Sequence, residues 1–295
     1  MSVAATGFFD GVHLGHQKVL SAVRDKAREL GKESQIVTFW PHPRSVLQQQ
    51  AYDLRLLTSL QEKEMLFSSL GIDKITVLDF TREFSRLSTE QFLRQYLVEK
   101  CGVSHLVIGY DHRIGHDQGE TQSQMIETCR RCGIETIRVE ELVMNGQTIS
   151  STKIRRLLEE GNVVRAAEFL GRKYALKGVV ISGNHLGRTI GFPTANLGLY
   201  NPLKLVPMNG VYAVDVLLRK EKYRGICNIG VRPTVNAGNN ISIETHILDF
   251  DEDIYGLDLV VEFVGRIREE VKFPSLQALK AQLEKDKTDC LKYFL

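Results

Sequence analysis

A glycine-rich stretch near the middle of the chain has residue types that bind phosphate, with glycines at Gly183, Gly187 and Gly191. Because glycine has no side chain, its backbone N–H groups can approach a phosphate closely. The stretch runs directly into Phe-Pro-Thr-Ala-Asn, which places the oxygen-bearing side chains of Thr194 and Asn196 on one side of an extended segment. Such hard oxygen ligands suit Mg²⁺ and phosphate. The spacing fits neither a Walker A nor a dinucleotide-binding loop, and a glycine-rich hairpin is the alternative.

Two histidines, His13 and His16, follow a predicted strand at the point where a helix begins. Gly15 between them leaves room for a phosphate, so the N–H groups of the helix and two imidazoles would converge on one anion. A metal-binding histidine pair and two solvated histidines are the alternatives to this anion site.

Hydroxyl and basic side chains are concentrated in residues 149–155, Ile-Ser-Ser-Thr-Lys-Ile-Arg, at the predicted start of another helix. Such a group can bind the β- and γ-phosphates of a nucleotide as they leave. Either Ser151 or Thr152 would also serve as the N-cap of a helix that begins near Lys153, and both roles are compatible.

A strand predicted at 241–249 carries Glu244 and His246 on the same face, because alternate residues of a strand point the same way. A carboxylate that enters a barrel core must have a partner or a function. Phosphoryl transfer to a hydroxyl needs a group that positions the hydroxyl and accepts its proton. Glu244 is therefore expected to have a partner or a function of this kind, and an exposed strand acid is the alternative.

The composition bounds the class of protein. The 295 residues are enough for two domains that each bury a core, and 43% apolar with 25% charged residues is typical of a soluble globular protein. A net charge of +2 argues against a dedicated nucleic-acid surface. No apolar run approaches the ~18 residues that a membrane span needs. The first residues lack the basic region of a signal peptide.

The five cysteines are an odd number without a framework pattern, which fits a reducing cytoplasm. Cys129 and Cys132 form a CxxC pair, but no second pair stands at zinc-binding spacing. We therefore expect two thiols on one face of a helix rather than a metal site.

Alternating strands and helices in the first half predict a parallel sheet with helices on both faces, whose ligands bind outside the carboxyl ends of the strands. The predicted strands are 3–9, 35–39, 73–79, 103–108 and 134–139. The predicted helices are 14–30, 59–70, 88–100 and 121–132.

The second half is predicted to be rich in strands. Residues 154–170 are predicted to form two short helices broken at Gly161-Asn162, and a domain boundary is predicted after them, at about 171. Short strands separated by turns then predict a small closed barrel with a closing helix at 276–285. These strands are 174–182, 210–219, 223–230, 241–249 and 257–266.

The motifs of the first half resemble the flavin branch of the HxGH nucleotidyltransferases, which transfer AMP from ATP. Residues 7–16, Gly-Phe-Phe-Asp-Gly-Val-His-Leu-Gly-His, carry the resemblance, and residues 149–155 are similar to the superfamily's ISSTxIR signature. Residues 109–115 depart from the branch's GxNFxFG or GxDFxFG pattern, because His112 and Ile114 stand where aromatic residues are common. The resemblance places Asp111 near the substrate, although by itself this residue is as plausibly a turn residue.

The motifs of the second half resemble riboflavin kinases. Residues 183–196 are similar to their ATP/Mg²⁺ loop, and residues 243–250 to their ExHxLDF segment, whose Glu serves as the base. Residues 228–234 are similar to their NIGxRPT segment, which we interpret as a structural strand and turn. The whole chain therefore resembles the bifunctional prokaryotic riboflavin kinase/FAD synthetase family.

This resemblance implies an α/β fold followed by a β fold. Residues 1–171 would form a Rossmann-like parallel-sheet domain of the HxGH superfamily, which joins FMN to AMP from ATP and releases FAD and pyrophosphate. Residues 172–295 would form a small closed β-barrel of the riboflavin kinase type with a C-terminal helix, which phosphorylates riboflavin to FMN. ATP would be the co-substrate at both sites, Mg²⁺ the cofactor, and riboflavin, FMN and FAD the substrates and products.

The resemblance also assigns residues. Catalytic roles fall to Glu244, His13 and His16, and Mg²⁺ binding to Thr194 and Asn196. Nucleotide and phosphate binding fall to a larger set: Gly7, Phe9, Asp10, Gly11, Gly15, Asp111, Ser150, Ser151, Thr152, Arg155, Gly183, Gly187, Gly191 and Pro193.

Three other functions compete with this one: a riboflavin kinase with an inactive N-terminal domain, a nucleotidyltransferase for another phosphate-bearing acceptor, and a flavin-binding carrier without turnover. A carrier would not need both sets of motifs. We expect a cytoplasmic monomer, or a weakly self-associating chain, without nucleic-acid or membrane partners.

Overall fold

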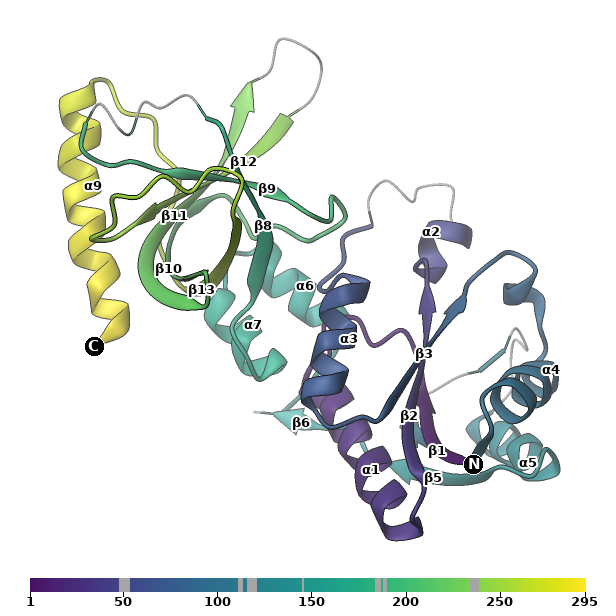
Figure 1. Cartoon of the computed structure of the whole chain (residues 1–295). Helices are drawn as coiled ribbons and strands as arrows, with labels where there is room; N and C mark the ends of the chain where they lie inside the picture. The colour runs from purple at the N-terminus through teal and green to yellow at the C-terminus, as the bar shows by residue number, and fades with distance from the viewer. Residues whose placement is uncertain are drawn as a thin grey trace. The chain divides into compact units, whose positions relative to one another are not determined.

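The computed structural model describes residues 1–47, 54–110, 114–115, 121–144, 146–183, 187, 190–233 and 239–295. Contacts divide the chain into two compact units, Met1–Ser151 and Thr152–Leu295 (Figure 1). Within the described ranges, no helix combines the length and the apolar character needed to cross a membrane.

The first unit is built on a five-stranded sheet in the order β3-β2-β1-β4-β5, and all four strand pairs are parallel. This confirms the predicted parallel sheet. The strands are β1 (Ser2–Thr6), β2 (Glu33–Trp40), β3 (Lys74–Asp79), β4 (Val103–Gly109) and β5 (Glu135–Val139). The prediction of a first strand through residue 9 was wrong, because the backbone at Phe9 is left-handed, with φ 53°, and leaves the sheet.

The structure has helices at all four predicted places of the first unit, and two short ones, α2 (Pro43–Leu47) and η2 (Phe84–Arg86), that were not predicted. The other helices are α1 (Leu14–Leu30), α3 (Leu60–Ser69), α4 (Thr89–Gln91), η3 (Phe92–Lys100) and α5 (Gln122–Arg131), with a ribbon of β6 (Val143–Met144) and β7 (Gln147–Thr148). The predicted helix 88–100 consists of one α-turn and then a π-helix, whose wider turns carry Phe92, Leu93 and Leu97 into the core.

Helices cover both faces of this sheet (Figure 1), and a layer of buried hydrophobic side chains lies between the sheet and the helices on each face. Val3 and Ala5 of β1 pack with α1 and α3, whereas Ala4 between them packs with η3 and α5. Successive side chains of β1 point to opposite faces of the sheet, and both faces are covered. The middle residues of β1 are therefore all apolar.

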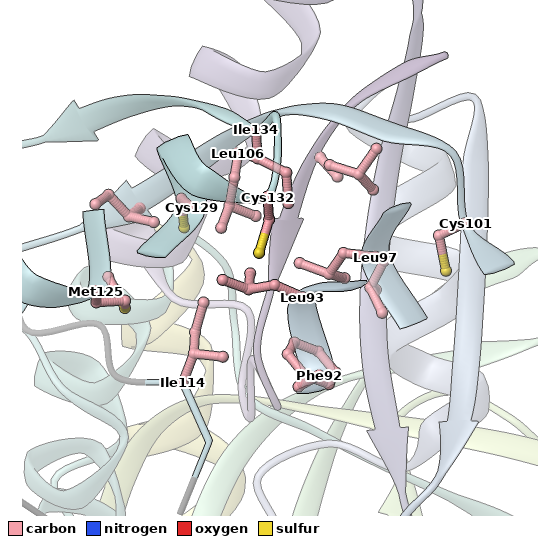
Figure 2. Close-up of a cluster of buried hydrophobic side chains, with 14 of the residues drawn as sticks. Phe92, Leu93, Leu97, Cys101, Leu106, Ile114, Met125, Cys129, Cys132 and Ile134 are labelled. Carbon is pink, nitrogen blue, oxygen red and sulfur yellow. The ribbon is translucent and has the colours of Figure 1, made fainter. Parts of the chain in front are cut away.

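The thiols of the first unit belong to the layer under η3 and α5 (Figure 2). Cys129 lies on α5 and Cys132 is its C-cap, and both side chains are buried and form no disulfide. Burial raises the pKa of Cys132, which keeps the thiol protonated. Within the described part of the chain, no group of three or more His, Cys, Asp or Glu residues is arranged to hold a metal ion.

The second unit contains a closed six-stranded barrel in the order β10-β11-β12-β9-β8-β13. This confirms the predicted small closed barrel. Its strands are β8 (Ala175–Ile181), β9 (Ala195–Leu199), β10 (Gly210–Leu218), β11 (Glu221–Pro233), β12 (Asn239–Ile247) and β13 (Asp258–Arg268). The predicted strands omitted β9, which follows Pro193 and contains Gly198, two residue types that are rare in strands. β9 is nevertheless needed, because it joins β12 to β8 and closes the barrel.

Two helices precede the barrel, α6 (Ser151–Glu159) and α7 (Val163–Leu170). The predicted break between them is confirmed: Gly161 is left-handed, and the Asn162 side chain caps α7 by accepting from the Arg165 N–H. Contacts place both helices in the second unit, whereas the sequence motifs assign them to the first domain, and the boundary at 171 stays a prediction.

A C-terminal helix, α9 (Leu276–Leu291), packs on the outside of the barrel and is followed by η4 (Lys292–Phe294). The carboxylate of Asp286 on α9 is fully buried. It accepts hydrogen bonds from Nε and Nη2 of Arg268 at 2.8 and 2.7 Å, and from Gln282 Nε2 at 2.8 Å. The buried pair therefore fastens the helix to β13.

Replacing Asp286 by Ala should lower the free energy of unfolding of the second unit by about 3 kcal/mol, because Arg268 would lose its partner. Urea denaturation followed by hydrogen exchange of the barrel strands would measure this change separately from the first unit. Asp289→Ala is the matched control, since its ion pair with Lys292 lies at the surface and should leave the midpoint unchanged. An unaltered midpoint in Asp286→Ala would contradict the proposed anchor.

Candidate active sites

The loop between β1 and α1, residues 7–16, is called the histidine loop below. Three of its residues are left-handed, with φ angles of 53° at Phe9, 81° at Gly11 and 41° at Val12. Such backbone is unfavourable for Phe and Val, so the surrounding structure must hold it in place. The loop leaves the carboxyl end of β1, where a parallel sheet binds its ligands.

Asp10 supplies one anchor for this loop. Its carboxylate accepts hydrogen bonds from the backbone N–H groups of Leu57 and Thr58, each at 3.0 Å, and from the Thr58 hydroxyl at 3.1 Å. The Thr58 hydroxyl in turn accepts from the Gly11 N–H at 2.9 Å. Asp10 is therefore a structural part of the loop, and its predicted contact with nucleotide stays a prediction.

The two histidines lie together at the N-terminus of α1. His13 is the N-cap, and its Nδ1 accepts from the His16 N–H at 3.3 Å. The two rings stack with their centroids 3.6 Å apart. Because Nδ1 of His13 is an acceptor, the ring proton of the neutral form lies on Nε2.

Glycines make room for rings in this loop. A Cβ at Gly15 would lie 3.2 Å from the His13 ring, and one at Gly7 would lie 3.2 Å from the Phe9 ring. The space that was predicted to admit a phosphate at Gly15 thus admits the His13 ring. The roles of Gly7, Phe9, Gly11 and Gly15 toward a nucleotide stay predictions.

His16 is held neutral. Burial lowers its pKa well below the usual value, and the charges of His13 and Lys63 lower it further. Its Nδ1 is buried and has no hydrogen-bond partner within the described part of the chain. An imidazole with an unpaired nitrogen beside a helix N-terminus is suited to bind a phosphate oxygen.

The hydroxyl motif meets the histidine loop through Ser151, whose Oγ donates to the backbone carbonyl of Asp10 at 2.8 Å. The helix α6 begins at Ser151, so Ser151 and Thr152 lie in its first turn and not at the predicted N-cap position. Ser150 directly precedes the helix. Thr152 and Arg155 belong to the second unit, and their approach to the histidines stays a prediction.

The third motif of the first half is only partly described. Asp111 and His112 lie outside the described residues. Ile114 is a buried residue of the core under η3 and α5, and its carbonyl accepts from the Thr89 hydroxyl at 2.9 Å. The residue that departs from the family's aromatic pattern therefore serves the core.

In the barrel, Glu244 lies on β12 between two asparagines. The strand registers pair it with Asn196 on β9 and with Asn228 on β11. Directly opposite residues of antiparallel strands project to the same side, so the carboxylate is flanked by two amide side chains. Asn228 had been interpreted as structural, and only the register reveals its place.

The prediction that Glu244 enters the barrel core was wrong. The buried residues of β12 are Ile243, Thr245 and Ile247, whereas Glu244 is partly exposed on the other face. The alternation of residues along β12 correctly divided them into two faces, but it did not tell which face points into the barrel. A partly exposed carboxylate can meet a substrate without opening the barrel.

The glycine-rich stretch packs closely around the Phe-Pro-Thr-Ala-Asn segment. A Cβ at Gly183 would lie 2.1 Å from the Asn196 side-chain nitrogen, and one at Gly187 would lie 2.2 Å from the carbonyl oxygen of Phe192. The Phe192 N–H also donates to the Gly187 carbonyl at 2.9 Å, and Gly191 is left-handed with φ 83°. These glycines therefore let the stretch fold against Asn196, which is only 8% exposed.

His246 fixes the same segment, although the predicted site did not include it. Its Nδ1 donates to the carbonyl of Pro193 at 2.7 Å, and its ring lies 5.1 Å from that of Phe192. Burial lowers the pKa of His246, which favours the neutral ring. The alternation of residues along the predicted strand had already placed His246 on the same face as Glu244. That shared face was the sequence feature that could have identified His246 as a site residue.

Family models match both halves of the chain. The model for FAD synthetase covers residues 1–153, and the model for riboflavin kinase covers residues 170–294. The fold and motifs described above thus occur in the halves for which the resemblance implied them. The presence of both domains favours two activities over a riboflavin kinase with an inactive partner domain.

Known relatives agree over nearly the full length. The chain is 40% identical to the bifunctional riboflavin kinase/FMN adenylyltransferase of Bacillus subtilis and 35% identical to that of Escherichia coli K12, covering 99% of this chain and 92% of each relative. A crystal structure described as a macrolide-efflux protein from Streptococcus pneumoniae is 32% identical, with a TM-score of 0.90 over 97% of this chain and 93% of that one. The chain belongs to the family of bifunctional riboflavin kinase/FMN adenylyltransferases.

Proposed function

We propose that the barrel unit transfers the γ-phosphoryl group of ATP to riboflavin, giving FMN, and that the first unit joins FMN to the AMP of a second ATP, giving FAD and pyrophosphate. The observation that carries this proposal is the pairing of Glu244 with Asn196 across β12 and β9. It puts a carboxylate beside a candidate metal ligand, which is what phosphoryl transfer to a hydroxyl requires.

In the first reaction, Glu244 accepts the proton of the 5′-hydroxyl of the ribityl chain. The hydroxyl oxygen forms a bond to the γ-phosphorus while the bond to the β–γ bridging oxygen breaks, so FMN and ADP result. Asn196 and Asn228 flank the carboxylate and orient it toward the hydroxyl. The Gly183–Gly191 stretch covers the nucleotide.

Thr194 and Asn196 fit a Mg²⁺ ion. One offers a hydroxyl and the other an amide oxygen, both hard ligands, and the Asn196 side chain is buried and held against Gly183. A bound Mg²⁺ would neutralise the charge of the ATP phosphates. Pro193 contributes through its carbonyl, by which His246 holds the segment in place.

In the second reaction, a phosphate oxygen of FMN attacks the α-phosphorus of ATP in line, and pyrophosphate leaves. His13 and His16 donate to the phosphates at the N-terminus of α1, where the helix dipole favours negative charge. Residues 150–155 bind the departing pyrophosphate. Positioning and charge stabilisation suffice, so no covalent enzyme intermediate forms.

We also infer a cytoplasmic enzyme that is monomeric or weakly self-associating, with riboflavin, FMN and ATP as its partners rather than nucleic acid or a membrane. The five cysteines support the location, because all are buried and none forms a disulfide. Free thiols are typical of a reducing compartment.

Chromatography of flavins tests the function directly. One reaction contains the protein with riboflavin, ATP and Mg²⁺, and a parallel one contains FMN in place of riboflavin. We expect FMN and then FAD in the first and FAD in the second. Flavin that stays unchanged while bound to the protein would overturn the proposal in favour of a carrier.

Glu244→Gln should abolish the formation of FMN from riboflavin and leave FAD formation from supplied FMN at the wild-type rate. The amide keeps the size of the carboxylate but cannot accept the proton. Glu221→Gln, an exposed residue at the start of β11, is the matched control and should retain both activities. Normal phosphorylation of riboflavin by Glu244→Gln would remove Glu244 as the base.

His13→Ala should show the opposite pattern, with FAD formation lost and FMN formation retained. The variant lacks both an imidazole and the N-cap of α1, so fluorescence of Trp40, the single tryptophan and a residue of the first unit, must confirm that this unit is folded. The control is His105→Gln, because His105 lies near the amino end of β4, and this variant should retain both activities. Loss of both activities in folded His13→Ala would contradict separate sites.

His16 should remain neutral well below pH 6.5, because burial disfavours its imidazolium. Imidazole NMR spectra of the ¹⁵N-histidine-labelled protein, with His16→Asn for assignment, would show this. Below pH 6.5 the unfolded chain binds the proton first, so the contribution of His16 lowers the stability as the pH falls and is absent above pH 6.5. An imidazole of His16 that titrates near 6.5 would disprove the burial argument.

A further inference from the structure

A lysine is buried beneath the histidine loop. Lys63 lies on α3 and its side chain has no exposed surface. Lysine is almost never fully buried unless it is paired, because removing its charge from water is unfavourable. Neither reaction described above uses this residue.

The amine of Lys63 reaches the backbone of the loop. Its Nζ donates to the Phe8 carbonyl at 2.9 Å and lies within 3.4 Å of the Thr38 hydroxyl on β2. It also sits over the face of the Phe8 ring, 3.6 Å from the centroid, which is a favourable cation–π geometry. One amine therefore joins α3, β2 and the residue that precedes the left-handed Phe9.

Phe9 is thereby held from both sides. Lys63 binds the carbonyl of Phe8 on one side, and the backbone of Leu57 and Thr58 binds the carboxylate of Asp10 on the other. The ring of Phe9 contacts that of His16 edge to face, with the centroids 5.3 Å apart. The unfavourable backbone at Phe9 thus sets where His16 lies, and two anchors from residues 57–63 maintain it.

The charge of Lys63 is linked electrostatically to the residues of the histidine loop. Burial lowers the pKa of Lys63 to about 8, while the nearby Asp10 and Glu64 raise it in part. The titratable groups near the amine are Asp10, Glu64 and His16, and His42 packs edge to face on the Phe8 ring. At neutral pH the ammonium form predominates, and a charged donor makes the stronger hydrogen bond to the Phe8 carbonyl.

We propose that Lys63 is a positioning residue for the transfer of AMP to FMN, which holds the Phe8 carbonyl with its ammonium group and so fixes the turn that places His13 and His16. This inference rests on the assignment of the histidine loop to that reaction. Lys63 itself touches no substrate.

The test compares Lys63→Met with the wild-type chain, with FMN and ATP supplied and FAD measured. We expect kcat to fall by roughly 10²-fold, as for a displaced catalytic group, with a smaller change in KM. Lys26→Met on α1, whose lysine is paired with Glu29 near the surface, is the matched control and should keep the wild-type rate. Fluorescence of Trp40 reports whether the first unit is folded.

The pH profile separates positioning by the charged amine from packing alone. Wild-type FAD formation should fall as the pH rises through about 8, where Lys63 loses its proton, and this fall should be absent from the residual activity of Lys63→Met. A folded Lys63→Met variant with the wild-type kcat, or a wild-type profile that is flat through pH 8, would overturn the proposal. If Lys63→Met does not fold, the wild-type profile decides.

These outcomes remain distinct from a failure of the assigned reaction. If the wild-type chain makes no FAD from FMN and ATP, the function of the first unit is wrong and the role of Lys63 falls with it. If the wild-type chain and Lys63→Met make FAD equally well, only the role of Lys63 is wrong.

Discussion

The hydrogen bonds between the Asp10 carboxylate and the backbone of Leu57 and Thr58 are the constraint on which the first site depends. They tie the loop after β1 to the segment that starts α3, across 47 positions in sequence. Without such a tie, a left-handed Phe and Val in one turn would relax toward ordinary backbone. Ser151 joins the same turn through the Asp10 carbonyl, so the two signatures of the first half meet at one residue. Asp10, which the resemblance assigned to nucleotide binding, thus supports the turn that leads to His13 and His16.

In the barrel, the candidate base is positioned by strand register rather than by a loop anchor. Glu244 is placed by its two neighbouring strands, and the register fixes the asparagines that stand beside it. The segment that carries Thr194 is held by Gly183 and Gly187, which pack closely against it, and by His246 of β12, which donates to the Pro193 carbonyl. The rigid part of the site therefore lies on strands, and the stretch that would cover a nucleotide is attached to it through close backbone packing.

Much of this arrangement could be predicted from the sequence, for identifiable reasons. The alternation of apolar strands and amphipathic helices predicted the parallel sheet, because its helices bury one face each. Contiguous motifs predicted the helix start that carries the histidines and the strand that carries Glu244, since each motif spans a single turn or strand. The family assignment followed from their order along the chain.

The rest depended on long-range contacts. Residues 194–196 were expected to be extended, but β9 was not among the predicted strands, because only its pairing with β12 and β8 outweighs the weak strand propensity of a segment that follows proline. Glu244 was expected to enter the barrel, whereas the buried residues of β12 are Ile243, Thr245 and Ile247, so the packing of the strand decides which of its two faces is inside. Lys63 belongs to no motif of the sequence, and only the fold brings its amine to a carbonyl 55 positions away.

The buried cysteines have a practical consequence for covalent chemistry. Cys101, Cys129 and Cys132 belong to the first unit, and Cys227 and Cys290 to the second. Burial raises the pKa of Cys227 to about 12 and that of Cys290 to about 11, so almost no thiolate is available to an alkylating reagent while the barrel is intact. Each unit thus carries internal reporters of its own opening, and mass spectrometry of alkylated peptides can follow the loss of each fold within one intact chain.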